Sequence, residues 1–137
     1  MKCGLLGRTL AHSYSPQIHS YLGKYSYELF EQEPENVREF LNNSDFTAIN
    51  VTIPYKKDVM PYCAELTDCA KKMGAVNTII RRPDGKLIGH NTDYFGLHYT
   101  FQRMGIVKYL LAKFIFIWHK KTTINYISTF INCIQHS

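Results

Sequence analysis

The segment at residues 50–57, NVTIPYKK, joins a strand-like alternation to a proline and two lysines. The alternation places Asn50 and Thr52 on the strand face opposite the aliphatic side chains. Polar groups on a strand of an α/β sheet are costly unless they are hydrogen-bonded, and ligands of such sheets bind at the carboxyl ends of strands. Asn50 and Thr52 therefore face a cleft, with Lys56 just beyond the strand, or else they belong to an edge strand with a solvated face. The expected apolar face consists of Ile49, Val51 and Ile53.

Two hydroxyl groups stand in the loop AHSYSP at residues 11–16, which leads into a helix beginning near Pro16. The free amides and partial positive charge of a helix N-terminus favour an anion such as a carboxylate, so Ser13 and Ser15 are candidate ligands for one. The alternative is structural, with Ser15 as the helix cap and Ser13 as a turn residue.

Two further polar groups interrupt apolar surroundings. Asn77 in GAVNTI lies within an apolar strand, and its amide needs a partner, which a backbone turn or a ligand would supply. Asn91, Thr92 and Asp93 in GHNTDYFG stand where a strand meets a helix. For this trio the alternative to a binding role is a helix cap provided by Thr92 or Asp93.

Composition excludes several classes of protein. The 137 residues carry a formal net charge of +5, but residues 1–106 hold 12 basic and 11 acidic side chains, which argues against a nucleic-acid partner. No window is apolar enough for a membrane span. The cysteines form no CxxC pair and the histidines no metal spacing, so we expect reduced thiols, no metal site and a cytoplasmic protein. The cysteines are Cys3, Cys63, Cys69 and Cys133.

The order of elements predicts an α/β fold. Strands separated by helices favour a three-layer sandwich with a mainly parallel sheet and one antiparallel hairpin strand near its edge. The turn chemistry of Pro83, Asp84 and Gly85 marks the hairpin, and Gly74 marks the end of a helix. We expect strands at residues 2–7, 27–32 and 46–53, the hairpin at 75–92, and helices from Pro16 and over 34–43, 55–66, 68–74 and 93–105.

The motifs AHSYSP, NVTIPYK, GAVNT and NTD, in this order and at these separations, resemble the substrate-binding domain of the shikimate dehydrogenase family over roughly residues 4–106. The resemblance implies that residues 1–106 form such a domain. It further implies catalytic roles for Lys56 and Asp93, and it implies substrate contacts from both. The other implied substrate-binding residues are Ser13, Ser15, Thr52 and Asn77.

The resemblance also implies an activity: NADP-dependent interconversion of 3-dehydroshikimate and shikimate, in aromatic amino-acid biosynthesis. Lys56, paired with Asp93, would hydrogen-bond the reacting oxygen and take part in proton transfer. No glycine-rich phosphate-binding turn occurs in the sequence, so we assign no cofactor-binding residue.

Residues 107–137 contain no glycine, proline or acidic residue. We expect this atypical tail, of truncated or frame-shifted origin, to replace the NADP-binding domain, and we expect the chain alone to be inactive. A separately encoded NADP-binding domain would then complete the enzyme. The expected partners are such a domain or a second copy of the chain in a homodimer, besides the small-molecule substrate. The alternative function is that of a stand-alone domain that binds shikimate or quinate without catalysis.

Overall fold

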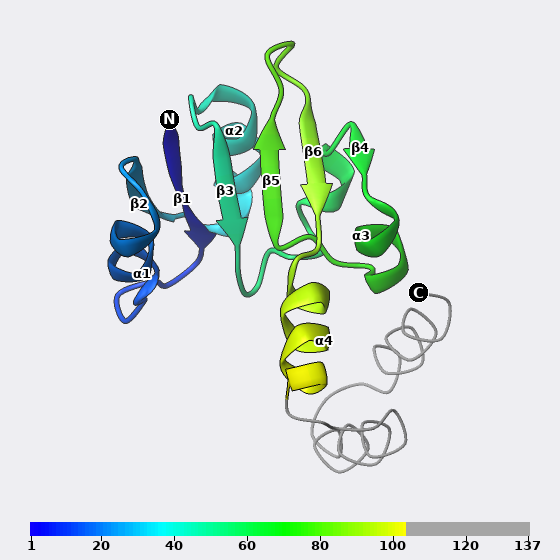
Figure 1. Cartoon of the computed structure of the whole chain (residues 1–137). Helices are drawn as coiled ribbons and strands as arrows, with labels where there is room; N and C mark the ends of the chain where they lie inside the picture. The colour runs from blue at the N-terminus through cyan, green and yellow to red at the C-terminus, as the bar shows by residue number, and fades with distance from the viewer. Residues whose placement is uncertain (104–137) are drawn as a thin grey trace.

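Alternating apolar residues build a six-stranded sheet in the computed structural model of the chain, which describes residues 1–103 (Figure 1). The strand order is β2-β1-β3-β5-β6-β4. Only β5 runs against its neighbours, because β1 pairs in parallel with β2 and β3, and β4 in parallel with β6. The strands are β1 (Lys2–Gly7), β2 (Ser26–Glu31), β3 (Ala48–Val51), β4 (Glu65–Leu66), β5 (Thr78–Arg81) and β6 (Leu87–His90).

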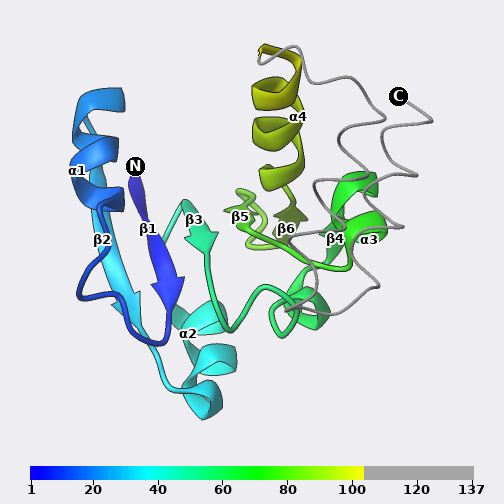
Figure 2. The same cartoon turned by 90° about the horizontal axis from the view of Figure 1, so that it is seen from below.

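Helices lie on both faces of this sheet, and Figure 2 shows α1 and α2 on opposite sides of the row of strands. The predicted three-layer α/β sandwich with one antiparallel strand is thus confirmed. None of the helices in the described part of the chain has the length and apolar character that a membrane span requires. The α-helices are α1 (Ser15–Leu22), α2 (Val37–Asn43), α3 (Asp68–Met73) and α4 (Asp93–Arg103), with short 3₁₀ helices at Pro34–Asn36 and Met60–Tyr62.

The two faces of the sheet differ in chemistry. Odd-numbered residues of β3 and β5, such as Ile49 and Ile79, are buried on the α2 face with Leu6 of β1. Even-numbered residues of the same strands point to the α1 face, where Asn50 and Thr78 stand directly opposite each other. The main apolar cluster therefore lies on the α2 face, and the α1 face carries polar side chains beside a few buried apolar ones, such as Leu5.

The turn residues behave as predicted at both glycines. Gly74 adopts φ 60° and ends α3, where its amide donates to the carbonyls of Ala70 and Lys71. Gly85 adopts φ 83° in the hairpin turn, and its amide donates to the carbonyl of Arg82 at 2.9 Å. These left-handed conformations favour glycine, which explains why the sequence marked both positions.

The predicted helix over residues 55–66 is wrong. Turns, one 3₁₀ helix and β4 occupy this segment. Pro61 lacks the amide hydrogen that an α-helix interior needs, and the chain instead pairs with β6, since the Ala64 amide donates to the carbonyl of Leu87 at 2.9 Å.

The hairpin β5–β6 lies near one edge of the sheet, as predicted, with the short strand β4 beyond β6. Two smaller expectations need correction. Strand β2 begins and ends one residue earlier than predicted. Strand β3 ends at Val51, and Ile53 is 78% exposed because the chain has already turned, with the Tyr55 amide donating to the carbonyl of Thr52. The predicted helix end at Gly105 and the tail at 107–137 lie outside the described residues.

Candidate functional site

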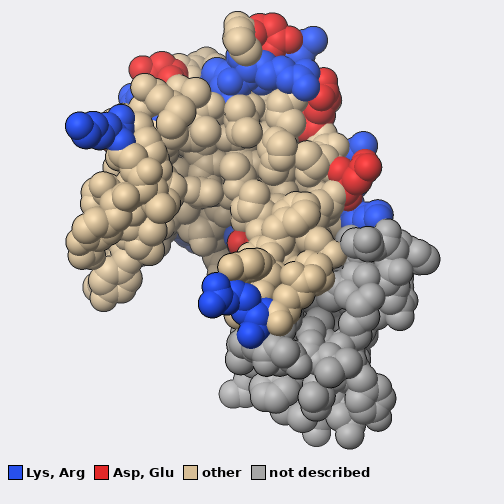
Figure 3. Space-filling view, in the orientation of Figure 1, with Lys and Arg blue, Asp and Glu red and all other residues tan. Residues whose placement is uncertain are grey.

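Four segments meet at one edge of the sheet. The carboxyl ends of β1, β3 and β6 point to the lower edge in Figure 1, and the antiparallel β5 begins there. The loop before α1, the turn after β3, Asn77 and the start of α4 are therefore neighbours at this edge. Figure 3 shows a hollow in the surface between the α1 side and the α4 side. Carboxyl ends of strands are where α/β sheets bind ligands.

The turn after β3 holds Lys56 in place from both sides. The preceding Tyr55 is 1% exposed, and its hydroxyl donates to the carbonyl of Gln32 at 2.5 Å. The carbonyl of Lys56 itself accepts the Val76 amide at 2.7 Å. With its backbone anchored in this way, Lys56 directs its side chain toward the start of α4.

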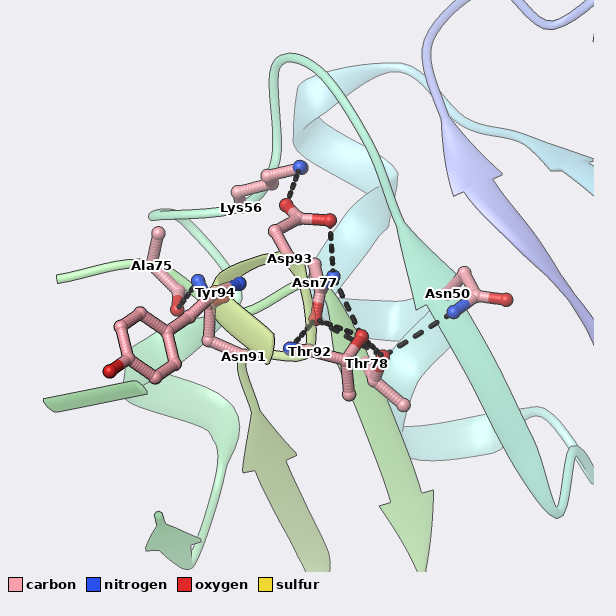
Figure 4. Close-up of polar contacts among 9 residues, drawn as sticks. All are labelled: Asn50, Lys56, Ala75, Asn77, Thr78, Asn91, Thr92, Asp93 and Tyr94. Atoms are coloured by element: carbon pink, nitrogen blue, oxygen red, sulfur yellow. Dashed lines mark hydrogen bonds and ion pairs between the residues drawn. The ribbon is translucent and has the colours of Figure 1, made fainter. Parts of the chain in front are cut away.

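An ion pair joins Lys56 to the first residue of α4 (Figure 4). Lys56 Nζ donates to Asp93 Oδ2 at 2.5 Å, and Asp93 Oδ1 accepts from Asn77 Nδ2 at 2.7 Å. The first turn of a helix also favours a carboxylate, through its free amides and dipole. Two residues from separate segments, Lys56 and Asn77, thus converge on the carboxylate of Asp93. It is Lys56, the lysine singled out by the sequence, and not the adjacent Lys57, that makes this pair.

The amide of Asn77 has a defined orientation. Its oxygen accepts the backbone N–H of Thr92 at 2.8 Å, and a backbone N–H can only donate. The amide nitrogen must then face Asp93, as observed. Asn77 is only 7% exposed, so the turn-like role considered for it is replaced by a side-chain network.

The cap of α4 differs from both predicted alternatives. The Thr92 hydroxyl turns to Asn77 Oδ1 at 3.2 Å, and Asp93 is the first helical residue. The side chain that serves as cap is Asn91, whose Oδ1 accepts the Tyr94 amide at 3.3 Å while its Nδ2 donates to the Ala75 carbonyl at 3.0 Å. This arrangement leaves the Asp93 carboxylate for Lys56 and Asn77.

The two polar residues of β3 have different surroundings. Asn50 Oδ1 accepts from the Tyr27 hydroxyl at 2.8 Å, and Asn50 Nδ2 donates to Thr78 Oγ1 at 3.3 Å. Thr52 follows the end of β3, half-buried, and its amide donates to the Leu6 carbonyl at 2.9 Å. Asn50 is thus part of a polar network on the sheet, and Thr52 stands at the edge where the ligand is expected.

Ser13 and Ser15 lie at the start of α1, on the α1 side of the hollow. The structure corrects the predicted cap, because α1 begins at Ser15 itself, follows Tyr14, and has no side-chain cap. Ser13 Oγ accepts the Ser15 amide at 3.2 Å, and both serines are half-buried. The two serines thus lie at the start of α1, whereas the Lys56–Asp93 ion pair lies at the start of α4.

An open pocket of about 450 Å³ adjoins the ion pair. Asp93 and Lys56 form its polar wall, with apolar groups from Pro54 and Met73 on other sides. An ammonium group has three donor hydrogens, so Lys56 can hydrogen-bond a ligand oxygen while it stays paired with Asp93. A lysine held in this way is suited to stabilise charge on that oxygen or to exchange a proton with it. Among residues 1–103, no group of three or more side chains is arranged to hold a metal ion.

Sequence reasoning missed Tyr27, Thr78 and the capping role of Asn91. The strand alternation around Ile79 already indicates that Thr78 shares a face with Asn50 once β3 and β5 are paired, but the pairing itself is not evident from spacing. Burial raises the pKa of Tyr27 to about 12, so its hydroxyl stays protonated and available as a donor at neutral pH.

Comparison with known proteins points to one family. The family model for the shikimate dehydrogenase substrate binding domain matches residues 5–79. A shikimate dehydrogenase (NADP(+)) of Clostridium beijerinckii is 50% identical over 101 residues, which are 68% of this chain and 37% of the relative.

Two solved structures share the fold. Shikimate dehydrogenase 1 from Peptoclostridium difficile gives a TM-score of 0.72 at 38% identity, over 77% of this chain and 43% of that one. Shikimate 5-dehydrogenase from Thermus thermophilus, in complex with NADP(H) and shikimate, gives 0.71 at 30% identity, over 79% and 44%. The chain thus spans less than half the length of each of these relatives.

Proposed function

Because the chain belongs to the shikimate dehydrogenase substrate-binding domain family, we propose that it binds shikimate and 3-dehydroshikimate in the hollow between α1 and α4. The observation that carries this proposal is the convergence of Lys56 and Asn77 on the carboxylate of Asp93. This domain extends over residues 1–106, followed by the separate tail at 107–137. We propose that the protein is cytoplasmic and belongs to aromatic amino-acid biosynthesis.

Each residue predicted to bind the substrate has a chemical role in this proposal. Ser13 and Ser15, at the start of α1, hydrogen-bond the carboxylate of the substrate, where helix amides add favourable charge. Thr52 and Asn77 bind ring hydroxyls. Lys56 hydrogen-bonds the oxygen that is a ketone in one substrate and a hydroxyl in the other, and it holds or releases the proton there. Asp93 keeps the ammonium group directed at that oxygen and also contacts the substrate.

The described residues do not fit the pyrophosphate of NADP. Nucleotide sites of the dinucleotide type use a glycine-rich turn between a strand and a helix N-terminus. Of the strand-to-helix junctions among residues 1–103, the one before α1 carries the Ser13–Ser15 loop and the one before α4 leads to the Asp93 carboxylate, which repels phosphate. The junctions that follow β2 and β4 contain no glycine. Hydride transfer therefore requires a nucleotide-binding domain that residues 1–103 do not form. Residues outside this range or a partner chain would have to supply that domain. We derive no catalytic step through the nucleotide.

A second function follows from the same observation. A domain with ligand groups for a hydroxylated ring acid but no fit to a nucleotide would act as a stand-alone binding domain for shikimate or quinate. The two functions differ in turnover: the first predicts NADPH-linked reduction of 3-dehydroshikimate once a nucleotide-binding domain is supplied, and the second predicts binding without reduction under any such condition. We expect no turnover by the 137-residue chain alone.

Calorimetric titration of the 137-residue chain with shikimate, without nucleotide, tests the shared part of the proposal. We expect saturable binding that weakens about tenfold in S13A or S15A, as the loss of a hydrogen bond to a charged group predicts. The matched control is S20A, because Ser20 lies on the same helix and its hydroxyl donates to the Gln17 carbonyl at 2.7 Å. Quinate in place of shikimate measures the preference between ring acids. Absence of saturable shikimate binding would overturn the proposal.

A further inference from the structure

A row of polar side chains crosses the α1 face of the sheet. The strand register places Tyr27 on β2, Asn50 on β3 and Thr78 on β5 on the same side of the sheet. Cys3 of β1 pairs with both Tyr27 and Ala48, and Ala48 shares its face with Asn50, which stands opposite Thr78. Strand β1 lies between β2 and β3, and Tyr27 pairs with Cys3 of β1. The tyrosine ring therefore spans β1 to bring its hydroxyl to Asn50.

Hydrogen bonds connect this row without a break to the Lys56–Asp93 pair, and Figure 4 shows the part from Asn50 onward. The Tyr27 hydroxyl donates to Asn50 Oδ1 at 2.8 Å, and Asn50 Nδ2 donates to Thr78 Oγ1 at 3.3 Å. Thr78 Oγ1 then donates to Asn77 Oδ1 at 3.1 Å. Asn77 Nδ2 donates to Asp93 Oδ1 at 2.7 Å. Every donor in the series points from β2 toward Asp93.

The other end of the row lies at α1. The Tyr27 ring stacks on His19 of α1, with ring centroids 3.7 Å apart and planes at 15°. Burial is the largest effect on the pKa of Tyr27 and raises it to about 12. Through His19, Tyr27 thus contacts α1, whose first turn carries Ser15, and it also begins the series that ends at Asp93.

We propose that Tyr27 is a positioning residue that couples α1, through the ring of His19, to the Lys56–Asp93 pair, through Asn50, Thr78 and Asn77. This inference rests on the proposed function only for the identity of the ligand. By linking the two sides of the hollow, the tyrosine hydroxyl sets the separation between the groups that hold the substrate carboxylate and those that hold its reacting oxygen. A ligand that must contact both sides loses affinity when any link is cut.

A purely local role for each side chain makes a different prediction. If Tyr27 only satisfied the amide of Asn50, its loss would not alter Asn77, which lies three hydrogen bonds from Tyr27. If the links acted independently, the effects of cutting two of them on affinity would multiply. A connected series predicts instead that the second cut adds little to the first.

The first experiment records the side-chain amide signals of Asn77 by NMR, identified by their disappearance in N77D. The variants are Y27F, which keeps the ring stacked on His19 and removes only the hydroxyl, and T78V, which cuts the link next to Asn77. Both should shift the Asn77 amide signals. The matched control is Y25F, because the Tyr25 hydroxyl contacts His19 Nδ1 at 2.6 Å and lies outside the series. Unchanged Asn77 signals in Y27F overturn the inference.

The second experiment measures shikimate affinity for the same chains by calorimetry. We expect Y27F and T78V each to weaken binding about 3- to 10-fold, the range of one neutral hydrogen bond. The double variant Y27F/T78V should bind within about twofold of the weaker single variant. Multiplying effects, or an affinity of Y27F equal to that of the unsubstituted chain, overturn the inference while the proposed function stands. If the unsubstituted chain binds no shikimate, the proposed function fails, and the Asn77 signals still decide whether the coupling exists.

Discussion

Replacing Asp93 by asparagine separates the ligand-directed role of this carboxylate from its contribution to folding. Each carboxylate oxygen accepts from one donor: Oδ1 from Asn77 and Oδ2 from Lys56. An asparagine at position 93 has one acceptor oxygen, and its amide nitrogen would face a second donor. Asn77 is held by the Thr92 amide and keeps its place, so the lysine is the group that loses its partner.

The size of each effect follows from exposure. The Lys56 side chain is 32% exposed and that of Asp93 is 56% exposed, so water replaces much of what the pair contributes to folding. We expect a loss of about 0.5–1 kcal/mol in the free energy of unfolding. Binding depends on where the ammonium group points, and loss of a charge-assisted hydrogen bond costs about 1.5–3 kcal/mol. That range corresponds to a rise in Kd of about 10- to 150-fold.

Calorimetric titration with shikimate gives the change in Kd, and urea denaturation gives the change in stability. The matched control is D45N, because Lys2 Nζ lies 2.8 Å from Asp45 Oδ1 in an ion pair that is also exposed. D45N should lose a similar small amount of stability and bind shikimate normally. The reasoning is refuted if D93N binds within twofold of the unsubstituted chain, or if its stability falls by more than about 3 kcal/mol, the loss expected of a buried structural group.

Three other outcomes follow from local geometry. A methyl group at Gly89 would lie 2.6 Å from Leu66 Cδ2, so G89A should lose about 1–3 kcal/mol in urea denaturation without a change in shikimate affinity. Burial raises the pKa of Cys63 to about 11, so its alkylation by iodoacetamide, followed by peptide mass spectrometry, should rise about tenfold per pH unit between pH 7 and 9 without a plateau. A hydrogen bond from Lys2 holds the pKa of Asp45 below its ordinary value, so the contribution of this pair to stability is lost as the pH falls through the lowered pKa. Below about pH 4, the urea midpoint of D45N should therefore vary less with pH than that of the unsubstituted chain.

The fold was predictable where residue patterns act locally. Alternation around Ile49 and the turn residues before Gly85 identified strands and hairpin, because side-chain period and backbone conformation are properties of short segments. The segment at 55–66 failed for the opposite reason. Pro61 and pairing with β6 prevent a helix there, and such pairing depends on residues distant in sequence.

The residues of the candidate site likewise divide into those that local sequence identifies and those that depend on strand pairing. Lys56, Asn77 and Asp93 stood out because each is a polar group beside an apolar strand or at a helix start, and the structure brings all three together. Tyr27 and Thr78 carried no such signal, since tyrosine and threonine are ordinary strand residues. Their contacts arise only when β3 is placed between β1 and β5, which is a property of the whole sheet.

The reversed direction of β5 has a practical consequence for work on this domain. Because β5 leaves the ligand edge and β6 returns to it, the hairpin turn at residues 82–86 lies at the opposite end of the sheet, at the top of Figure 1. The turn is exposed and rich in charged side chains. A fluorophore, an affinity handle or a surface tether attached there would leave the hollow open to titrated ligands. The turn thus offers a site for immobilising the domain with its ligand edge facing solution.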